Sequence, residues 1–136
     1  MKQSILSLFS KIQVVQVATC ADGQPHVRPM TLISYQEKFY LATGARDAKA
    51  AEISQNPKVE LCMMLPDDKH TGTLRMEGIM QQIDDLKIKK EVADWAEFIY
   101  DHWKDISDPG FRLYEVYFGK VQYIKPGEML AENLIW

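Results

Sequence analysis

At the centre of this sequence stand nine residues, Asp22-Gly23-Gln24-Pro25-His26-Val27-Arg28-Pro29-Met30. The Asp-Gly pair that begins them separates two apolar runs, 14–18 and 30–35. An Asp-Gly pair between two such runs is a strong signal for a β-hairpin. Further along, proline follows arginine within the second strand, and proline cannot donate a hydrogen bond to a neighbouring strand. The pair Arg28-Pro29 therefore marks either an edge strand with a solvated arginine or a place where the sheet opens and its backbone can meet a ligand.

The composition is that of one soluble domain spanning residues 1–136. Apolar residues make up 46% of the chain and charged residues 26%, which are ordinary values for a soluble globular protein. The net charge of −3 provides no basic surface for nucleic acid or for an anionic membrane. No apolar segment is long enough to span a membrane, and serines interrupt the N-terminal apolar run too early for a secretory signal. These features predict a cytoplasmic protein.

Cysteine and histidine residues give no indication of a metal site. Cys20 and Cys62 lie far apart and form no CxxC motif, so we interpret them as buried thiols in a reducing cytosol. The three histidines show no metal-ligand spacing and have no cysteine cluster nearby. We therefore predict that the protein binds no metal.

Hydrophobic periodicity predicts six strands, separated mostly by short turns. The predicted strands are 13–20, 26–35, 39–43, 58–65, 73–83 and 112–124. The predicted helices are 3–11, 46–55 and 84–103, and the tail 125–136 is expected to add a last turn of helix. Antiparallel strands in a meander bury their edges by closing into a barrel. We expect a mainly β fold with helices (α+β), built on a closed or nearly closed antiparallel barrel.

The segment 41–49 has the pattern of an anion site, because it runs from a strand through small residues into a helix start. Helix N-termini present free N–H groups and a positive dipole end. Thr43 adds a hydroxyl, and Arg46 and Lys49 are three positions apart and can share a helix face. The segment is not a P-loop, since the G-x-x-x-x-G-K-[ST] motif is missing. The alternative is a solvated basic helix start.

Several further motifs follow one another along nearly the whole chain. They are Ala18-Thr19, the stretch 22–30, Phe39-Tyr40-Leu41-Ala42-Thr43, Lys49, Ile53, Asn56-Pro57-Lys58-Val59, Arg75-Met76-Glu77-Gly78 and Asp108-Pro109-Gly110-Phe111. In this order they resemble the pyridoxamine 5'-phosphate oxidase-like family of flavin-binding split barrels. Each motif alone is loose, so the resemblance rests on their order.

The resemblance implies a six-stranded antiparallel split β-barrel that forms a homodimer with two FMN molecules at a shared interface. It implies that Arg28, Pro29 and Met30 line the flavin ring, mostly through backbone groups. It also implies that Thr43 and Lys49 hold the phosphate. FMN suits such residues, since it is an anion with a flat ring, and in flavoproteins the protein tunes the flavin while the flavin carries the electron chemistry.

Two departures from the family pattern bear on the ligand. The family often has a serine and an arginine just before the lysine, whereas this chain has Asp47 and Ala48. A carboxylate beside a phosphate is repulsive unless it points away; Asp47 would then cap the helix, and Arg46 would supply the missing positive charge. Enzymes of the vitamin B6 pathway end in an Arg-rich segment, but no arginine follows Arg112 here. That absence argues against pyridoxamine phosphate as the substrate.

The sequence thus predicts an FMN-dependent oxidoreductase of unknown substrate, with a small molecule or a nicotinamide as electron donor. Two alternatives stay open: the same fold binding haem or a deazaflavin, and a non-catalytic flavin-binding or stress module. No catalytic acid or base is identified, because the candidates are interpreted as structural: Tyr35, Tyr40, Tyr114, Tyr117 and Glu77.

Several apolar side chains support the expected homodimer, because a monomer of this length would leave them uncovered. They are Trp95, Phe98, Trp103 and Tyr117.

Overall fold

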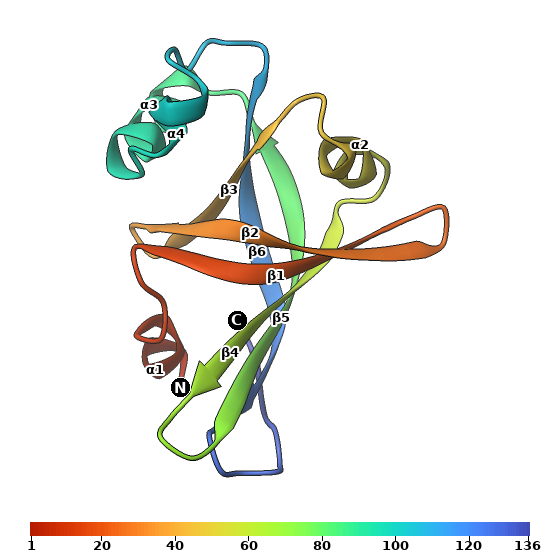
Figure 1. Ribbon diagram of the computed structural model, residues 1–136, viewed down its shortest axis with the longest axis vertical. Coiled ribbons are helices and arrows are strands. Elements are labelled where there is room, and N and C mark those ends of the chain that lie inside the picture. Colours follow the sequence, from red (N-terminus) through yellow and green to blue (C-terminus); the bar gives the residue numbers. More distant parts are fainter.

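A computed structural model describes all residues, 1–136, and shows a strongly curved antiparallel sheet with helices at both ends (Figure 1). The strands are β1 (Ile12–Ala21), β2 (Gln24–Tyr35), β3 (Lys38–Gly44), β4 (Lys58–Pro66), β5 (Thr71–Ile83), β6 (Phe111–Ile124) and β7 (Glu132–Ile135). The helices are α1 (Lys2–Leu6), α2 (Ala48–Gln55), α3 (Leu86–Trp95) and α4 (Ile99–His102). The predicted fold class, mainly β with helices, is confirmed.

The hairpin predicted from the Asp-Gly pair is confirmed. Strands β1 and β2 pair from Ile12 opposite Ile33 to Ala21 opposite Gln24. Asp22 and Gly23 alone form the turn, with φ angles of 52° and 74°. Two consecutive positive φ values match the right-handed twist of the strands, and this is why Asp-Gly is favoured at such turns.

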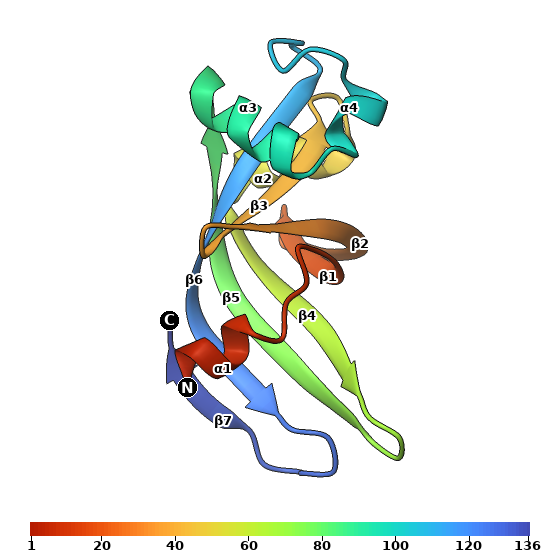
Figure 2. The same cartoon turned by 90° about the vertical axis from the view of Figure 1, so that its left-hand side faces the viewer.

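The sheet closes into a barrel because β3 pairs on both sides. The strand order is β3-β2-β1-β4-β5-β6-β7, and an additional pairing joins β3 to β6. Six strands therefore form the closed ring. The seventh strand, β7, pairs with residues 120–123 of β6 (Figure 2).

The seventh strand corrects the prediction of six strands and of a helical tail. Alternate residues from Glu132 to Trp136 are half-buried and exposed, which is the period of a strand rather than of a helix. The indole of Trp136 packs edge-on against Phe39 and Phe118. At the other end of the chain, Lys2 places its ammonium 4.7 Å from the same indole, so the two termini lie together (Figure 2).

The predicted helix 84–103 is wrong as a single element. Helix α3 ends at Trp95, and Ala96 leaves the helical region with φ −107° and ψ 77°. The break lets both Ala96 and Ile99 become fully buried in a core of eight residues between α3, α4 and the upper strands. A straight helix would carry Ile99 and the residues after it away from this core. The predicted helix 3–11 is also shorter, since α1 ends at Leu6.

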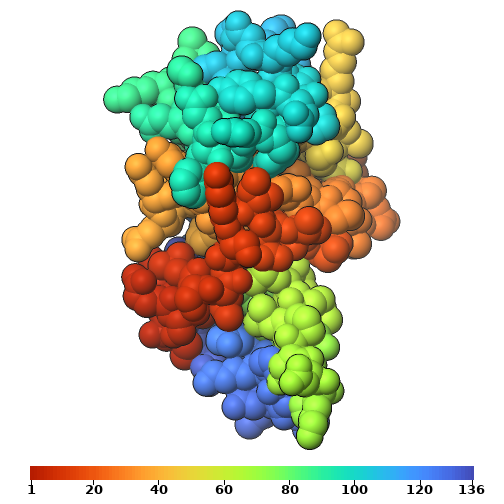
Figure 3. Space-filling view, turned by 60° about the vertical axis from the view of Figure 1, so that its left-hand side comes forward, coloured from red at the N-terminus to blue at the C-terminus, as the bar shows by residue number.

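The larger core, of 17 buried residues, fills the barrel, with side chains from the β1–β2 hairpin, from the other strands of the ring and from α1 and α2. The space-filling view shows the α3–α4 segment above this hairpin and α1 below it (Figure 3). No helix of the structure has the length and apolar character needed to cross a bilayer. The two cores leave the end of β3 and the start of α2 between them, and this region contains the candidate site.

Candidate functional site

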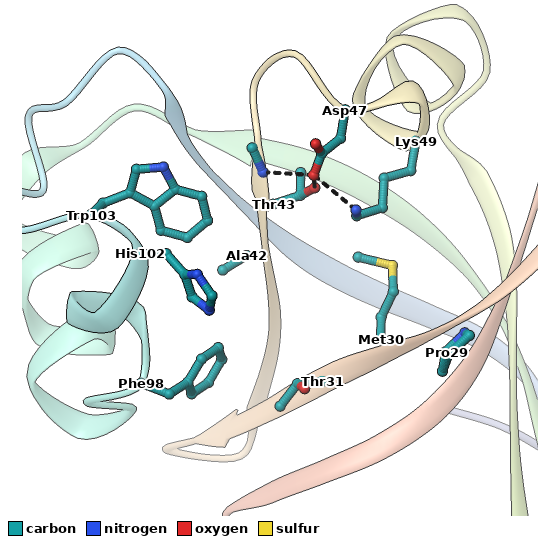
Figure 4. Close-up of a pocket in the computed structure, with 11 residues that line it drawn as sticks. Pro29, Met30, Thr31, Ala42, Thr43, Asp47, Lys49, Phe98, His102 and Trp103 are labelled. Carbon is teal, nitrogen blue, oxygen red and sulfur yellow. Dashed lines mark hydrogen bonds and ion pairs between the residues drawn. The ribbon is translucent and has the colours of Figure 1, made fainter.

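A cavity of about 500 Å³ lies between β2, β3, the start of α2 and the end of α4. This volume is within the range of roughly 300–1,000 Å³ that is usual for small-molecule sites. The lining residues are Pro29, Met30, Thr31, Ala42, Thr43, Gly44, Asp47, Lys49, Phe98, His102 and Trp103 (Figure 4).

The cavity opens where β3 leaves β2. The β2–β3 ladder runs from Tyr35–Lys38 only as far as Leu32–Leu41, while β3 continues along β6 to Gly44. Residues 29–31 of β2 therefore have no partner strand on that side. The prediction that the sheet opens at Arg28-Pro29 agrees with this separation, and β2 lies inside the sheet rather than at its edge.

The two walls of the cavity differ in chemistry (Figure 4). The wall contributed by the end of β3 and the start of α2 is polar. The opposite wall, from α4 and its flanks, carries the rings of Phe98, His102 and Trp103. Ala42 lies between them, and Met30 lies near Lys49 on the side of the polar wall. Such a cavity suits a ligand with an anionic end and a flat ring.

Three donors form a cradle at the polar wall: the hydroxyl of Thr43, the backbone N–H of Gly44 and the ammonium of Lys49. All three donate to one oxygen, Oδ2 of Asp47, at 3.0, 3.2 and 2.9 Å respectively. Thr43 is buried, with 2% of its surface exposed, whereas the Asp47 side chain is 49% exposed. The Lys49 ammonium, followed by the Thr43 hydroxyl, holds the pKa of Asp47 below its usual range.

Glycine at position 44 is what allows the carboxylate so close to the backbone. A Cβ at Gly44 would stand 3.3 Å from three atoms of the Asp47 side chain, which is tighter than ordinary van der Waals contact. A Cβ at this position would require the carboxylate to shift by a few tenths of an ångström within the cradle. The cradle therefore depends on a small residue in the β3–α2 turn, as the pattern of small residues in the sequence predicted.

Asp47 occupies the N-cap position of α2 but its side chain does not cap the helix. An N-cap aspartate ordinarily accepts a hydrogen bond from the N–H of the second or third helical residue. Here the side chain makes no such bond and points back to the β3 end and to Lys49 (Figure 4). The expectation that Asp47 caps the helix and points away from the cradle is therefore wrong.

Four of the six predicted site residues line the cavity: Pro29, Met30, Thr43 and Lys49. The remaining two, Arg28 and Arg46, do not. Arg46 lies in the β3–α2 turn with its side chain exposed.

Arg28 instead belongs to an internal cluster with Thr19 and Glu52. Its Nη2 donates to Oε2 of Glu52 at 2.6 Å and its Nη1 to the Thr19 hydroxyl at 2.8 Å. The Thr19 hydroxyl donates in turn to the same Glu52 oxygen at 2.7 Å. Arg28 stands opposite Val17 in the ladder, so it shares the face of the buried residues of β1 and lies under α2.

Sequence reasoning missed the aromatic wall. Phe98 and Trp103, which the sequence offered only as residues that a dimer would cover, line the cavity and pack against the smaller core. Phe98 and His102 are four positions apart, the spacing that places two side chains on one helical face. That spacing was a usable signal, but it does not indicate which element the face meets.

The outer face of the sheet exposes a group of large apolar side chains. Tyr117 is 48% exposed and Val27 68%. The strand registers place Ala18 beside Val27, Lys58 beside Ile79 and Ile79 beside Tyr117 on this face. The outer-face group is Val14, Val27, Met64, Ile79 and Tyr117. Because Val27, Pro29 and Thr31 alternate along β2, this face adjoins the mouth of the cavity.

Comparison with known proteins identifies relatives over most of the chain. The family model described as "Pyridoxamine 5'-phosphate oxidase" matches residues 1–125, which confirms the resemblance found in the sequence. General stress protein 26 of Bacillus subtilis is 24% identical over 135 residues, covering 98% of this chain and 94% of that protein.

Solved structures show the same fold. General stress protein 26 of Bacillus anthracis has a TM-score of 0.77 at 21% identity, covering 99% of this chain and 98% of that one. A NimC/NimA family protein of Clostridium acetobutylicum has a TM-score of 0.77 at 21% identity, covering 98% and 91%.

Two further neighbours have names that state a ligand. A FAD-binding protein of Mesorhizobium loti has a TM-score of 0.75 at 15% identity, covering 94% of this chain and 95% of that one. A haem-binding protein of Mycobacterium smegmatis has a TM-score of 0.75 at 12% identity, covering 92% and 53%. At these identities the likeness concerns the fold.

Proposed function

Because the chain belongs to the pyridoxamine 5'-phosphate oxidase family, we propose that it binds a flavin, FMN, in the cavity between β2, β3 and α4. The observation that carries the proposal is the convergence of three donors on a single anionic oxygen at one end of this cavity. Aromatic side chains line the opposite wall. This arrangement matches the two parts of FMN, a phosphate and a flat ring.

The residues that line the cavity have the chemical character needed to bind FMN. The Asp47 carboxylate stands in for an anion at the cradle and shows that the three donors can hold one. Lys49 would supply positive charge to the phosphate, and Thr43 and Gly44 would supply directed hydrogen bonds. Phe98 and Trp103 would pack on the apolar faces of the ligand and exclude water. When bound, the flavin would supply the redox chemistry of the site.

The proposal extends to a homodimer whose interface uses the outer-face group. Five large apolar side chains exposed on one sheet face are typical of an association surface. The same face adjoins the mouth of the cavity through β2, so a partner bound there would help to enclose the ligand. We expect sedimentation at micromolar concentration to give about twice the mass of the 15.7 kDa chain.

A charge placed in the outer-face group tests this association. Val27→Lys should produce a folded monomer with weaker flavin binding. Met129→Lys is the matched control, because Met129 is 92% exposed in the loop before β7 and outside the outer-face group. A wild type that sediments as a monomer would remove the dimer from the proposal, and a Val27→Lys protein that remains dimeric would place the interface outside the outer-face group.

The flavin proposal is tested by the visible spectrum of the purified protein, followed by titration with FMN. We expect oxidised-flavin absorbance, or saturable uptake of FMN with a change in flavin fluorescence. Ala42→Phe, which fills the cavity between its walls, should abolish uptake. Ala51→Phe adds the same ring on an exposed position of α2 and should not. Absence of FMN uptake by the wild type would overturn the proposal.

Haem is the second candidate, favoured by one observation: the imidazole of His102 lines the cavity, and histidine is the commonest axial ligand of haem iron. Haem uptake should give a Soret-type band that shifts or disappears in His102→Ala. Absence of a Soret band in the wild type would exclude haem, and a band unchanged by the substitution would exclude His102 as the axial ligand.

We infer that the protein is an oxidoreductase whose substrate is not pyridoxamine phosphate. A second phosphate would need its own cations, and after Arg112 the chain offers only Lys120 and Lys125. Lys125 is already paired with Glu132 at 3.3 Å. Anaerobic mixing of the flavin-loaded protein with NADPH, NADH and pyridoxamine phosphate in turn tests this inference; bleaching of the flavin band by pyridoxamine phosphate would contradict it.

A further inference from the structure

We propose that the Asp47 carboxylate is an internal competitor for the anionic group of the ligand, and that it sets how strongly the cavity prefers a phosphorylated ligand over its phosphate-free counterpart. The inference rests on the proposed function, since it concerns specificity within the same cavity. It assigns to Asp47 a role that the family resemblance did not provide, because this chain departs from the family pattern at that position.

The first argument is a count of hydrogens. A hydroxyl and a backbone N–H each have one hydrogen to donate. Thr43 and Gly44 both direct theirs to Oδ2 of Asp47, at 3.0 and 3.2 Å. While the carboxylate holds these hydrogens, neither group can serve a phosphate. Only Lys49, whose ammonium has three hydrogens, retains capacity for a second acceptor.

The second argument is electrostatic. A phosphate entering the cradle beside an ionised Asp47 would meet a like charge at contact distance, which is unfavourable even with partial solvent screening. Protonation does not relieve this repulsion near neutral pH, because Lys49 and Thr43 hold the pKa of the carboxyl below its usual range. The carboxylate must therefore leave the cradle when a phosphate binds.

The third argument is that the carboxylate is free to leave. Its side chain is 49% exposed and makes no hydrogen bond to α2. Rotation into solvent would sacrifice the three cradle bonds but would not uncap the helix. Asp47 thus reduces the affinity for a phosphorylated ligand without blocking it, and leaves a phosphate-free ligand at the ring wall unaffected.

The test compares FMN with riboflavin in wild type, Asp47→Ser and Asp67→Ser. Serine is short and neutral and remains a good N-cap residue, so α2 is retained. We expect Asp47→Ser to bind FMN about tenfold more tightly and riboflavin equally well. Asp67→Ser is the matched control: Asp67 also accepts local hydrogen bonds, from Lys69 and His70, but lies in the β4–β5 loop at the far end of the molecule (Figure 1). It should change neither affinity.

A second measurement needs no flavin. Inorganic phosphate is titrated into each protein while the backbone amide signal of Gly44 is followed by NMR. We expect a saturable shift in Asp47→Ser, a much weaker one in wild type, and none in Asp47→Ser combined with Lys49→Ala. The double variant shows that the shift reports the cradle.

The outcomes separate the two ideas. Phosphate binding enhanced by Asp47→Ser, without uptake of any flavin, would sustain the internal competitor and overturn the flavin proposal. Equal FMN affinity and equal phosphate shifts in wild type and Asp47→Ser would overturn the proposal that Asp47 competes with the phosphate. They would leave the flavin proposal unaffected. An equal gain for riboflavin and FMN would show that Asp47 obstructs the cavity sterically, and would also overturn the competitor.

Discussion

Helix α2 contains one acidic residue, Glu52, and has a second, Asp47, at its N-cap, and the surroundings of the two carboxylates differ in one respect. Glu52 belongs to the internal cluster, where its side chain is 14% exposed and that of Arg28 22%. Asp47 stands at the cradle, more exposed and bordering a cavity. Both carboxylates accept from a hydroxyl and from a cation. The charges of the internal cluster are paired with each other, whereas the cradle borders the cavity and can exchange its anion for a ligand.

The largest expected effect comes from breaking the internal cluster. Arg28→Ala should lower the free energy of unfolding by about 1.5–3 kcal/mol, the net value of hydrogen bonds to charged groups. It leaves Glu52, whose side chain is 14% exposed, with only the His26 imidazole nearby, 3.8 Å from Oε1. Denaturant unfolding measures the change, and Lys90→Ala, which removes an exposed ion pair with Asp94 on α3, should leave the midpoint almost unmoved.

The same Arg28 variant also separates stability from binding. FMN affinity, measured under conditions where Arg28→Ala is fully folded, should stay close to that of wild type. A stable Arg28→Ala protein that has lost FMN would contradict the structural role given to Arg28 and return it to the flavin site.

The next effect, about tenfold, concerns the cradle. Lys49→Ala removes one charge-assisted hydrogen bond to the phosphate and should weaken FMN binding by about that factor, as judged by fluorescence titration. Stability should change little, because Lys49 is partly exposed and its partner Asp47 can turn to water. Riboflavin affinity is the control and should not respond. Equal FMN affinity in variant and wild type would place the phosphate elsewhere.

Lowering the pH tests the internal cluster further, and the expected change in unfolding free energy is smaller. The Thr19 hydrogen bond, followed by the Arg28 charge, lowers the pKa of Glu52 in the folded protein. The stability that depends on this lowering is therefore present above the ordinary carboxyl pKa of about 4 and is lost as the pH falls through the lower folded value. The difference in unfolding free energy between wild type and Arg28→Ala should narrow as the pH falls below the ordinary carboxyl pKa of about 4. A difference that widens on acidification would contradict this account.

Local sequence signals predicted what local interactions decide. The Asp22-Gly23 turn needs only two positive φ angles, and the opening of the sheet near Pro29 follows from a missing donor. The small residues at the end of β3 indicated the anion cradle. Each of these features is settled within a few residues of the chain, so its sequence pattern is sufficient.

Features that depend on contacts between residues far apart in the chain were not predicted from the sequence. The break after Trp95 depends on burying Ile99 in a core that residues from β2, β3 and β6 complete. Arg28 could have been assigned to the buried face from its alternation with Val27 and Pro29, but its partner Glu52 is 24 positions away. The Asp47 side chain could adopt several rotamers at an N-cap position. The three donors of the cradle determine which one it adopts, and their convergence on one oxygen is not evident from the sequence.

The smallest effect is expected at Arg46, and it provides the strictest comparison with Lys49. Both are cations near the start of α2, but only Lys49 lines the cavity, and Arg46 is exposed in the turn. A solvated charge outside the site acts only through long-range attraction, which salt screens beyond roughly 8 Å at physiological ionic strength. Arg46→Ala should therefore weaken FMN binding less than about twofold at such ionic strength, with a somewhat larger effect at low salt. Paired titrations of Arg46→Ala and Lys49→Ala at two salt concentrations measure the contrast. A tenfold loss in Arg46→Ala that persists at high salt would mean that Arg46 turns into the site when the phosphate binds and supplies the positive charge that Ala48 does not.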